Sequence, residues 1–174
     1  VLNTTHEALH IWAGERKADI SAIIDQPRLQ QIVQATVNTN LTSRQDLLSS
    51  SQLQEMRSLF RETLTRQGYL SFAVINPEGV TLGATEDALV GGKHILSQNS
   101  NYLKRVFEGE VLVSLPMVSE VLLPNPFGEY EKNQPTMFVV GPIRNVGGQV
   151  LSALALRIDP NKDFTRIPQL GRMG

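Results

Sequence analysis

The chain has 174 residues, of which 41% are hydrophobic and 19% are charged, a composition typical of one folded globular domain. Sixteen Lys and Arg residues against seventeen Asp and Glu residues give a net charge of −1, which argues against a nucleic-acid-binding surface. Cysteine is absent, which excludes disulfide bonds, cysteine-ligated metals and a thiol nucleophile.

The first third of the sequence is predicted to be helical. Apolar residues recur at helical spacing from Leu9 to Ile24, and polar residues fall mostly between them. Asp25-Gln26-Pro27 interrupts this pattern, and the proline suits the first turn of a second helix that runs to about Val37.

A third long helix is predicted after a polar loop over residues 38–51. Ser51 and Gln54 resemble a capping box at its start, and an apolar stripe follows them. Gly68 stands where a helix commonly ends, because glycine adopts the left-handed backbone of a helix terminus most easily.

Strands are predicted from Tyr69 onwards. Asn76-Pro77-Glu78-Gly79 and Asn145-Val146-Gly147-Gly148 are turn sequences, and each joins two strands into a hairpin. Between the two hairpins we expect an irregular segment with Gly91-Gly92 and a short helix over residues 101–108. The five predicted strands cover residues 70–75, 80–84, 111–118, 136–143 and 149–158.

This order of elements indicates an α+β fold, since helices come first and hairpin-linked strands follow. We expect residues 1–68 to form a helical segment and residues 69–159 a five-stranded antiparallel sheet module. The long helices would cover one face of the sheet. The segment 91–109 would lie over the other face, with room for a small pocket beneath it.

A metal-binding motif occurs near the start of the chain. His6-Glu7-Ala8-Leu9-His10 matches the zinc-peptidase pattern H-E-x-x-H, in which two histidines share the metal and the glutamate acts as general base. Only five residues precede His6, Ala13 stands where the extended motif needs glycine, and no third histidine follows at the required position. We therefore expect a solvated helix face, with no metal, cofactor or catalytic residues, and a zinc peptidase remains a remote alternative.

Candidate ligand-binding residues lie in the short helix and in the strands after it. Tyr102 could stack on a ligand or donate a hydrogen bond, and Arg105 or Arg157 could neutralise a carboxylate. Arg157 stands in an apolar strand, which indicates either an edge position or a pocket anchor, and the usual exposure of arginine favours the edge. Phe138 and Val140 share one face of their strand, and alternation alone leaves open which face turns towards the helices. The five candidates are Tyr102, Arg105, Ser114, Phe138 and Arg157.

Several short motifs, in this order along the chain, resemble the Cache family of PAS-like sensor domains. They are a strand followed by a polar turn with glycine, a short aromatic-containing helix ending in glycine, and a final hairpin. An early segment also resembles the long helix that leaves the membrane in double Cache domains. The residues concerned are Trp12, Arg16, 25–29, 72–80, 101–109, 139–143 and 147–154.

The resemblance implies a PAS-like sheet in an extracytoplasmic ligand-sensing domain of a bacterial receptor, not an enzyme. The full-length receptor would be anchored in the inner membrane, with this domain in the periplasm or outside the cell. Its output would be a histidine kinase, a nucleotide cyclase or a chemoreceptor, and residues 160–174 would begin the linker to a second module. The ligand would be a small molecule, an anion being one option. The amino-acid-binding members of the family have Tyr, then Arg, then Trp-Tyr in this helix region. The present sequence has Tyr102 but continues with Lys104-Arg105-Val106-Phe107, so that motif is not matched.

A ligand-free interaction module is the alternative from a different functional class. Such a domain would form a homodimer through Trp12 and the exposed stripe of the first helix, or would bind another protein. Because residue 1 is Val, with no initiator methionine or signal peptide, we expect a domain excised from a longer chain.

Overall fold

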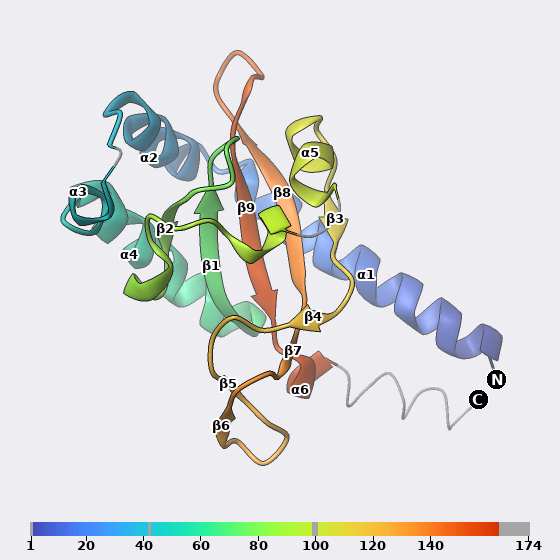
Figure 1. The fold of residues 1–174 in the computed structure, drawn as a ribbon. Helices are drawn as coiled ribbons and strands as arrows, with labels where there is room; N and C mark the ends of the chain where they lie inside the picture. The colour runs from blue at the N-terminus through green and yellow to red at the C-terminus, as the bar shows by residue number, and fades with distance from the viewer. Residues whose placement is uncertain (1, 42, 99–100, 164–174) are drawn as a thin grey trace.

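The computed structural model describes residues 2–41, 43–98 and 101–163. Four helices precede the sheet, and they lie behind it in Figure 1. None of the described helices combines the length and the hydropathy that a membrane span requires. The four helices are α1 (Leu2–Ile24), α2 (Pro27–Asn38), α3 (Arg44–Leu48) and α4 (Ser51–Gln67).

The predicted helix boundaries are correct at Pro27 and Gly68 and wrong between residues 38 and 51. α2 begins at Pro27, and Gly68 ends α4 with φ of 79°. The expected polar loop contains the short helix α3, because the Ser43 side chain accepts a hydrogen bond from the Asp46 N–H and caps it. The N-cap of α4 is Ser50 and not Ser51, since it is the Ser50 hydroxyl that accepts from the Leu53 N–H.

One antiparallel sheet of five strands forms the centre of the molecule, in the order β2-β1-β9-β8-β3. The α+β fold class and the antiparallel sheet predicted from the sequence are therefore confirmed. β9 is the middle strand and pairs with β1 on one side and β8 on the other. The strands are β1 (Tyr69–Ile75), β2 (Thr81–Ala84), β3 (Leu112–Val113), β8 (Phe138–Arg144) and β9 (Val150–Ile158).

The region between β3 and β8 differs from the prediction. The single strand expected over residues 111–118 is two strands, since the chain leaves the sheet at Ser114 and pairs again only from Met117. Residues 123–131, which lie outside the five predicted strands, contain a small hairpin that lies below the sheet in Figure 1. The additional strands are β4 (Met117–Val118), β5 (Leu123–Pro124), β6 (Tyr130–Glu131) and β7 (Pro135–Thr136).

The helices α1, α2 and α4 pack on one face of the sheet. Phe60 of α4 stacks on Phe72 of β1 with ring centroids 4.4 Å apart, and both side chains are buried. α1 crosses β8 at Gly141, where an added Cβ would lie 3.2 Å from the Ile24 side chain. Only the last turns of α1 are buried by this packing, and its first half projects beyond the sheet in Figure 1.

Residues 87–98 and 101–109, here called the cover segment, lie over the opposite face, as predicted. They contain η1 (Asp87–Leu89), η2 (Ile95–Gln98) and α5 (Tyr102–Phe107). Leu96 and Val106 of this segment form a second buried cluster with Phe138, Val140 and alanines of β1 and β9. Phe138 and Val140 therefore face the cover segment, and Val139 faces the helices.

The last strand leads into the short helix α6 (Pro160–Asp163). The predicted linker over residues 160–174 lies mostly outside the described residues, which end at residue 163. At the other end of β9, Gly148 has φ of 87°, as the predicted turn before this strand requires.

Candidate functional site

Arg157 lies near the end of the middle strand, β9, on the face of the sheet that the cover segment occupies. Its direct neighbours across the strands are Ser71 of β1 and Phe138 of β8. The residue is only 2% exposed, although arginine is almost never fully buried without partners. The edge position favoured by the sequence is therefore wrong, because β9 is paired on both sides.

Four polar side chains satisfy this buried guanidinium. Nη1 donates to Thr136 Oγ1 at 2.7 Å and to Ser119 Oγ at 3.4 Å, and Nε donates to Ser71 Oγ at 3.3 Å. Nη2 donates to the Glu120 carboxylate. The charge also sits 4.7 Å from the centre of the Phe138 ring, a cation–π distance. A buried cation without such partners would cost several kcal/mol, so this cluster is a constructed site for the guanidinium.

His94 is the second titratable group in this buried region. It is 4% exposed, and its ring meets Phe138 edge-on at 5.2 Å between centroids. Its Nδ1 accepts a hydrogen bond from the Leu96 N–H at 3.1 Å, so the ring proton is on Nε2. Burial, together with the positive charge of Arg157, lowers the pKa of His94 to about 4. The imidazole is therefore neutral at physiological pH and has an N–H available to donate.

Tyr102 and Ser114 are buried beside this group and make contacts with the backbone. The Tyr102 hydroxyl accepts from the Leu115 N–H at 3.0 Å. Ser114 Oγ accepts from the Phe138 N–H at 3.0 Å, and the Ser114 N–H donates to the Phe138 carbonyl. The two residues thus tie α5 and the chain after β3 to β8. Each hydroxyl keeps a proton that it can donate to a ligand.

Arg105 is exposed, whereas the other four sequence candidates are buried. Its side chain is 48% exposed on α5 and forms a two-pronged ion pair with Glu110, with contacts of 2.6 and 2.7 Å. The hydrogen bond to Glu110 raises the pKa of Arg105, and the same bond lowers the pKa of the Glu110 carboxyl. We leave Arg105 out of the site, since its guanidinium has a partner on the surface.

Sequence reasoning missed several residues of this cluster. They lie in strands or loops that carry no candidate motif. The only available signal was alternation, which places Ser71 and Arg157 on strand faces without showing that they face each other. The missed residues are Ser71, His94, Ser119, Glu120 and Thr136.

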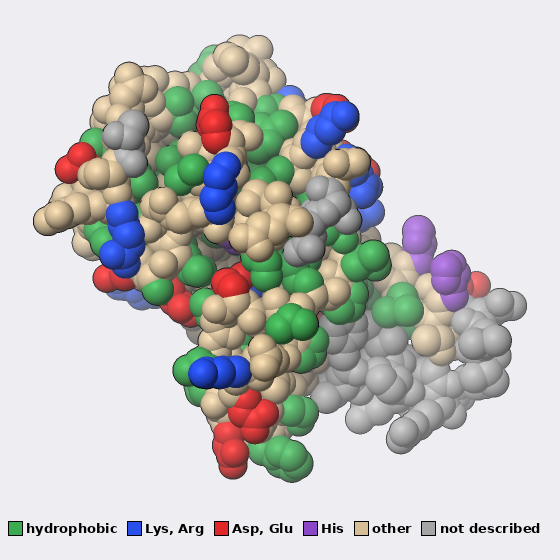
Figure 2. Space-filling view, viewed as in Figure 1, with side chains coloured by type: hydrophobic (Ala, Val, Ile, Leu, Met, Phe, Trp, Pro, Cys, Tyr) green, Lys and Arg blue, Asp and Glu red, His purple; other side chains and the backbone are tan. Residues whose placement is uncertain are grey.

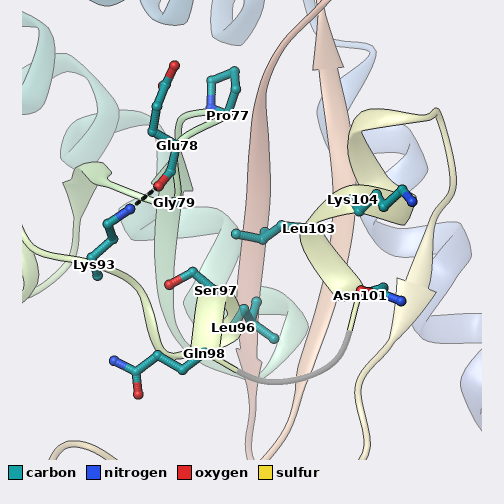
Figure 3. A pocket seen from close by; sticks show the side chains of 10 residues that line it. All are labelled: Pro77, Glu78, Gly79, Lys93, Leu96, Ser97, Gln98, Asn101, Leu103 and Lys104. Carbon is teal, nitrogen blue, oxygen red and sulfur yellow. Dashed lines mark hydrogen bonds between the residues drawn. The ribbon is translucent and has the colours of Figure 1, made fainter.

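An open groove of about 430 Å³ lies between the turn that joins β1 to β2 and residues of the cover segment (Figure 3). The Lys93 ammonium donates to the Glu78 carbonyl along its edge. None of the five predicted ligand-binding residues lines this groove. It is therefore a separate surface feature, lined by Pro77, Glu78, Gly79, Lys93, Leu96, Ser97, Gln98, Asn101, Leu103 and Lys104.

The H-E-x-x-H motif lies on the projecting half of α1. Its residues His6, Glu7 and His10 are exposed, and Figure 2 shows histidine side chains at this end of the molecule. Within the residues that the structure describes, no group of three or more His, Cys, Asp or Glu side chains is placed to hold a metal ion. The third ligand that a zinc peptidase needs is thus missing from the described part of the chain.

The sequence matches no protein-family model and no curated protein. Its structure is similar to the sensor domain of DcuS from E. coli, with a TM-score of 0.61 and 13% identity over 95% of this chain and 98% of that one. It is also similar to the sensory domain of the Campylobacter jejuni chemoreceptor Tlp3 with isoleucine bound, with a TM-score of 0.50 and 11% identity over 95% of this chain. That alignment spans 61% of the Tlp3 chain. The chain therefore has the fold of these sensor domains, and the PAS-like architecture implied by the Cache resemblance is confirmed.

Proposed function

We propose that this chain is the extracytoplasmic sensing domain of a bacterial membrane receptor, and that it binds a small molecule with an anionic group. The observation that carries the proposal is the buried guanidinium of Arg157, which lies on the middle strand of the sheet, on the same face as the cover segment. A buried guanidinium is well suited to a carboxylate, because its charge-assisted hydrogen bonds are stronger than neutral ones. The fold shared with the DcuS and Tlp3 sensor domains supports a sensing role over an enzymatic one.

The proposed site lies between the sheet and the cover segment. Arg157 would bind the anionic group, His94 would donate from Nε2, and Phe138 would supply an apolar wall. Tyr102 and Ser114 would donate further hydrogen bonds from their hydroxyls. Because Tyr102 belongs to α5 and Arg157 to β9, a ligand held by both would fix the cover segment on the sheet.

The wider receptor follows from the same proposal. The full-length protein would be anchored in the inner membrane and would pass the signal to a histidine kinase, a nucleotide cyclase or a chemoreceptor module. β9 carries Arg157 and runs directly into α6, so a shift of this strand on binding would reach the end of the described chain within six residues.

Thermal-shift measurements with carboxylates, amino acids and amines test the binding site. A ligand at a hundred times its Kd adds about 2.7 kcal/mol to the free energy of unfolding, which raises Tm by roughly 5–10 °C for a domain of this size. We expect carboxylates to give this rise and Arg157→Met to remove it. Arg105→Ala is the matched control, since that arginine is exposed, and it should keep the response. Binding that survives Arg157→Met would contradict the proposed site.

The exposed apolar residues of α1 support homodimerisation as a second role. Leu9 is 39% exposed and Ile11 is 61% exposed on the half of the helix that projects from the sheet. Trp12, which the sequence placed in the same exposed stripe, is partly buried and packs against the core. The dimer surface that we propose is therefore centred on Ile11, since Trp12 packs against the core and Leu9 lies about 200° around the helix from Ile11.

A further inference from the structure

We infer that Glu120 is an internal occupant of the Arg157 anion site, and that an anionic ligand binds by displacing its carboxylate. The inference rests on the proposed function, since it concerns the same site. It begins from an asymmetry in the pair. Arg157 is 2% exposed and belongs to the central strand, whereas the Glu120 side chain is 25% exposed and comes from the loop between β4 and β5.

The hydrogen-bond donors of Arg157 leave no room for a second carboxylate. A guanidinium has five N–H groups, one on Nε and two on each Nη. Nε is used by Ser71, and both protons of Nη1 are used by Thr136 and Ser119. Glu120 accepts from Nη2, so only one of the five N–H groups is left without a described acceptor, and a ligand carboxylate that needs two donors cannot bind while Glu120 stays.

Charge leads to the same conclusion. Arg157 and Glu120 together are neutral, so an anionic ligand would add a net negative charge to a site from which water is largely excluded. Two carboxylates on one guanidinium repel each other strongly at low dielectric. Release of Glu120 removes this repulsion and leaves the ligand as the only counter-ion of Arg157.

The partners of Arg157 differ in how firmly they are held. Ser71 and Thr136 belong to strands, and Ser119 is anchored through its N–H to the Gln134 carbonyl and through its hydroxyl to Val121. Among the described contacts, the Glu120 carboxylate bonds to Arg157 alone. Glu120 is thus the partner that can leave without breaking another interaction of its side chain.

The released carboxylate has a place to go. Glu120 lines a surface hollow of about 250 Å³ together with Lys132 and Asn133. Rotation into this hollow would return the carboxylate to water beside the Lys132 ammonium, at little cost. Ligand binding would then move the chain at residues 119–122. Glu120 would thus lower the affinity of the site for the ligand and would couple ligand binding to a movement of this loop.

Removal of Glu120 should convert Arg157 into an open anion site, and acetate is the probe. Glu120→Ala should lower Tm because Arg157 loses its counter-ion. Acetate exchanged for chloride at constant ionic strength should restore that Tm in proportion to its concentration. The wild-type protein should respond much more weakly than this variant at the same acetate concentrations, because acetate must displace Glu120. The double variant Glu120→Ala/Arg157→Met should not respond. Glu129→Ala is the matched control, because it removes an exposed carboxylate from the β5–β6 hairpin without touching Arg157. It should show no acetate-dependent rise in Tm.

A second measurement uses the carboxylate ligand that the thermal-shift screen identifies. Glu120→Gln keeps the shape of the side chain but removes its charge, and it should tighten the Kd of that ligand about tenfold or more, because the ligand no longer competes with an internal anion. An unchanged Kd together with no acetate rescue would overturn the inference while leaving the Arg157 site intact. Acetate rescue without any wild-type ligand would instead support the Glu120 inference and count against the proposed function.

Discussion

At the scale of single residues, a buried charge decides the character of the site. Arg157 is expensive to bury, and the fold compensates with three hydroxyls, a carboxylate and an aromatic face. The same positive charge acts on His94, whose neutral form it favours. The two residues thus offer an anionic ligand one permanent cation and one neutral donor.

The low pKa of His94 makes the stability of the domain depend on pH. In the unfolded chain His94 binds a proton below about pH 6.5, whereas in the folded protein it does so only below about pH 4. The unfolded state therefore holds the extra proton between these values. The free energy of unfolding should fall by roughly 3 kcal/mol as the pH drops from about 6.5 to 4, and then level off.

Urea denaturation of wild type and His94→Asn across this pH range tests the effect. The asparagine amide oxygen can still accept from the Leu96 N–H but does not titrate in this range. We expect the variant to lose less stability than the wild type between pH 6.5 and 4. Parallel pH profiles for the two proteins would show that His94 is not responsible.

At the scale of elements, the alternation of β8 and β9 sorts the core into two layers. Val139 and Leu156 face α1, α2 and α4, whereas Val140 and Ala155 face the cover segment. The sequence pattern predicts both helices and strands correctly in most places, because each element follows its own periodicity. It misses α3, because a side-chain cap stabilises that short helix. It also predicts one strand where β3 and β4 form, because β3 pairs with β8 whereas β4 pairs with β7.

The contact between α4 and β1 should dominate the stability of the helical layer. Phe60 is 1% exposed and stacks on Phe72, so Phe60→Ala removes a large buried ring and leaves a cavity. We expect a loss of about 3–5 kcal/mol in the free energy of unfolding, measured by chemical denaturation. The neighbouring Arg61→Ala, on the exposed side of the same helix, should change it by less than about 0.5 kcal/mol. Similar losses in both variants would show that this packing is not what holds α4.

At the scale of the whole molecule, the sheet separates the regions to which we assign the two proposed roles. Its cover-segment face holds the proposed ligand site, and its helical face carries α1, whose first half projects away (Figure 1). The small hairpin β5–β6 lies below the sheet, and Glu120 belongs to the loop that leads into it. Displacement of Glu120 would therefore move a part of the molecule distinct from both core layers.

The projecting half of α1 should mediate pairing of two copies. Ile11→Glu places a charge on the exposed apolar surface and should shift a dimer towards monomer in sedimentation experiments. Lys17→Glu alters charge elsewhere on the exposed helix surface and should leave the association unchanged. A wild-type protein that remains monomeric at all concentrations would refute this surface.

The sequence by itself determined the fold class, the two hairpin turns, the restart at Pro27 and the position of the cover segment. These features depend on local periodicity and on the backbone preferences of proline and glycine, which a single stretch of chain contains. Only the tertiary structure decided that Arg157 lies on the middle strand, which strand face meets the helices, and that His94 and Glu120 approach Arg157. Strand order and the pairing of residues dozens of positions apart set those contacts, and alternation along one strand carries no information about its neighbours.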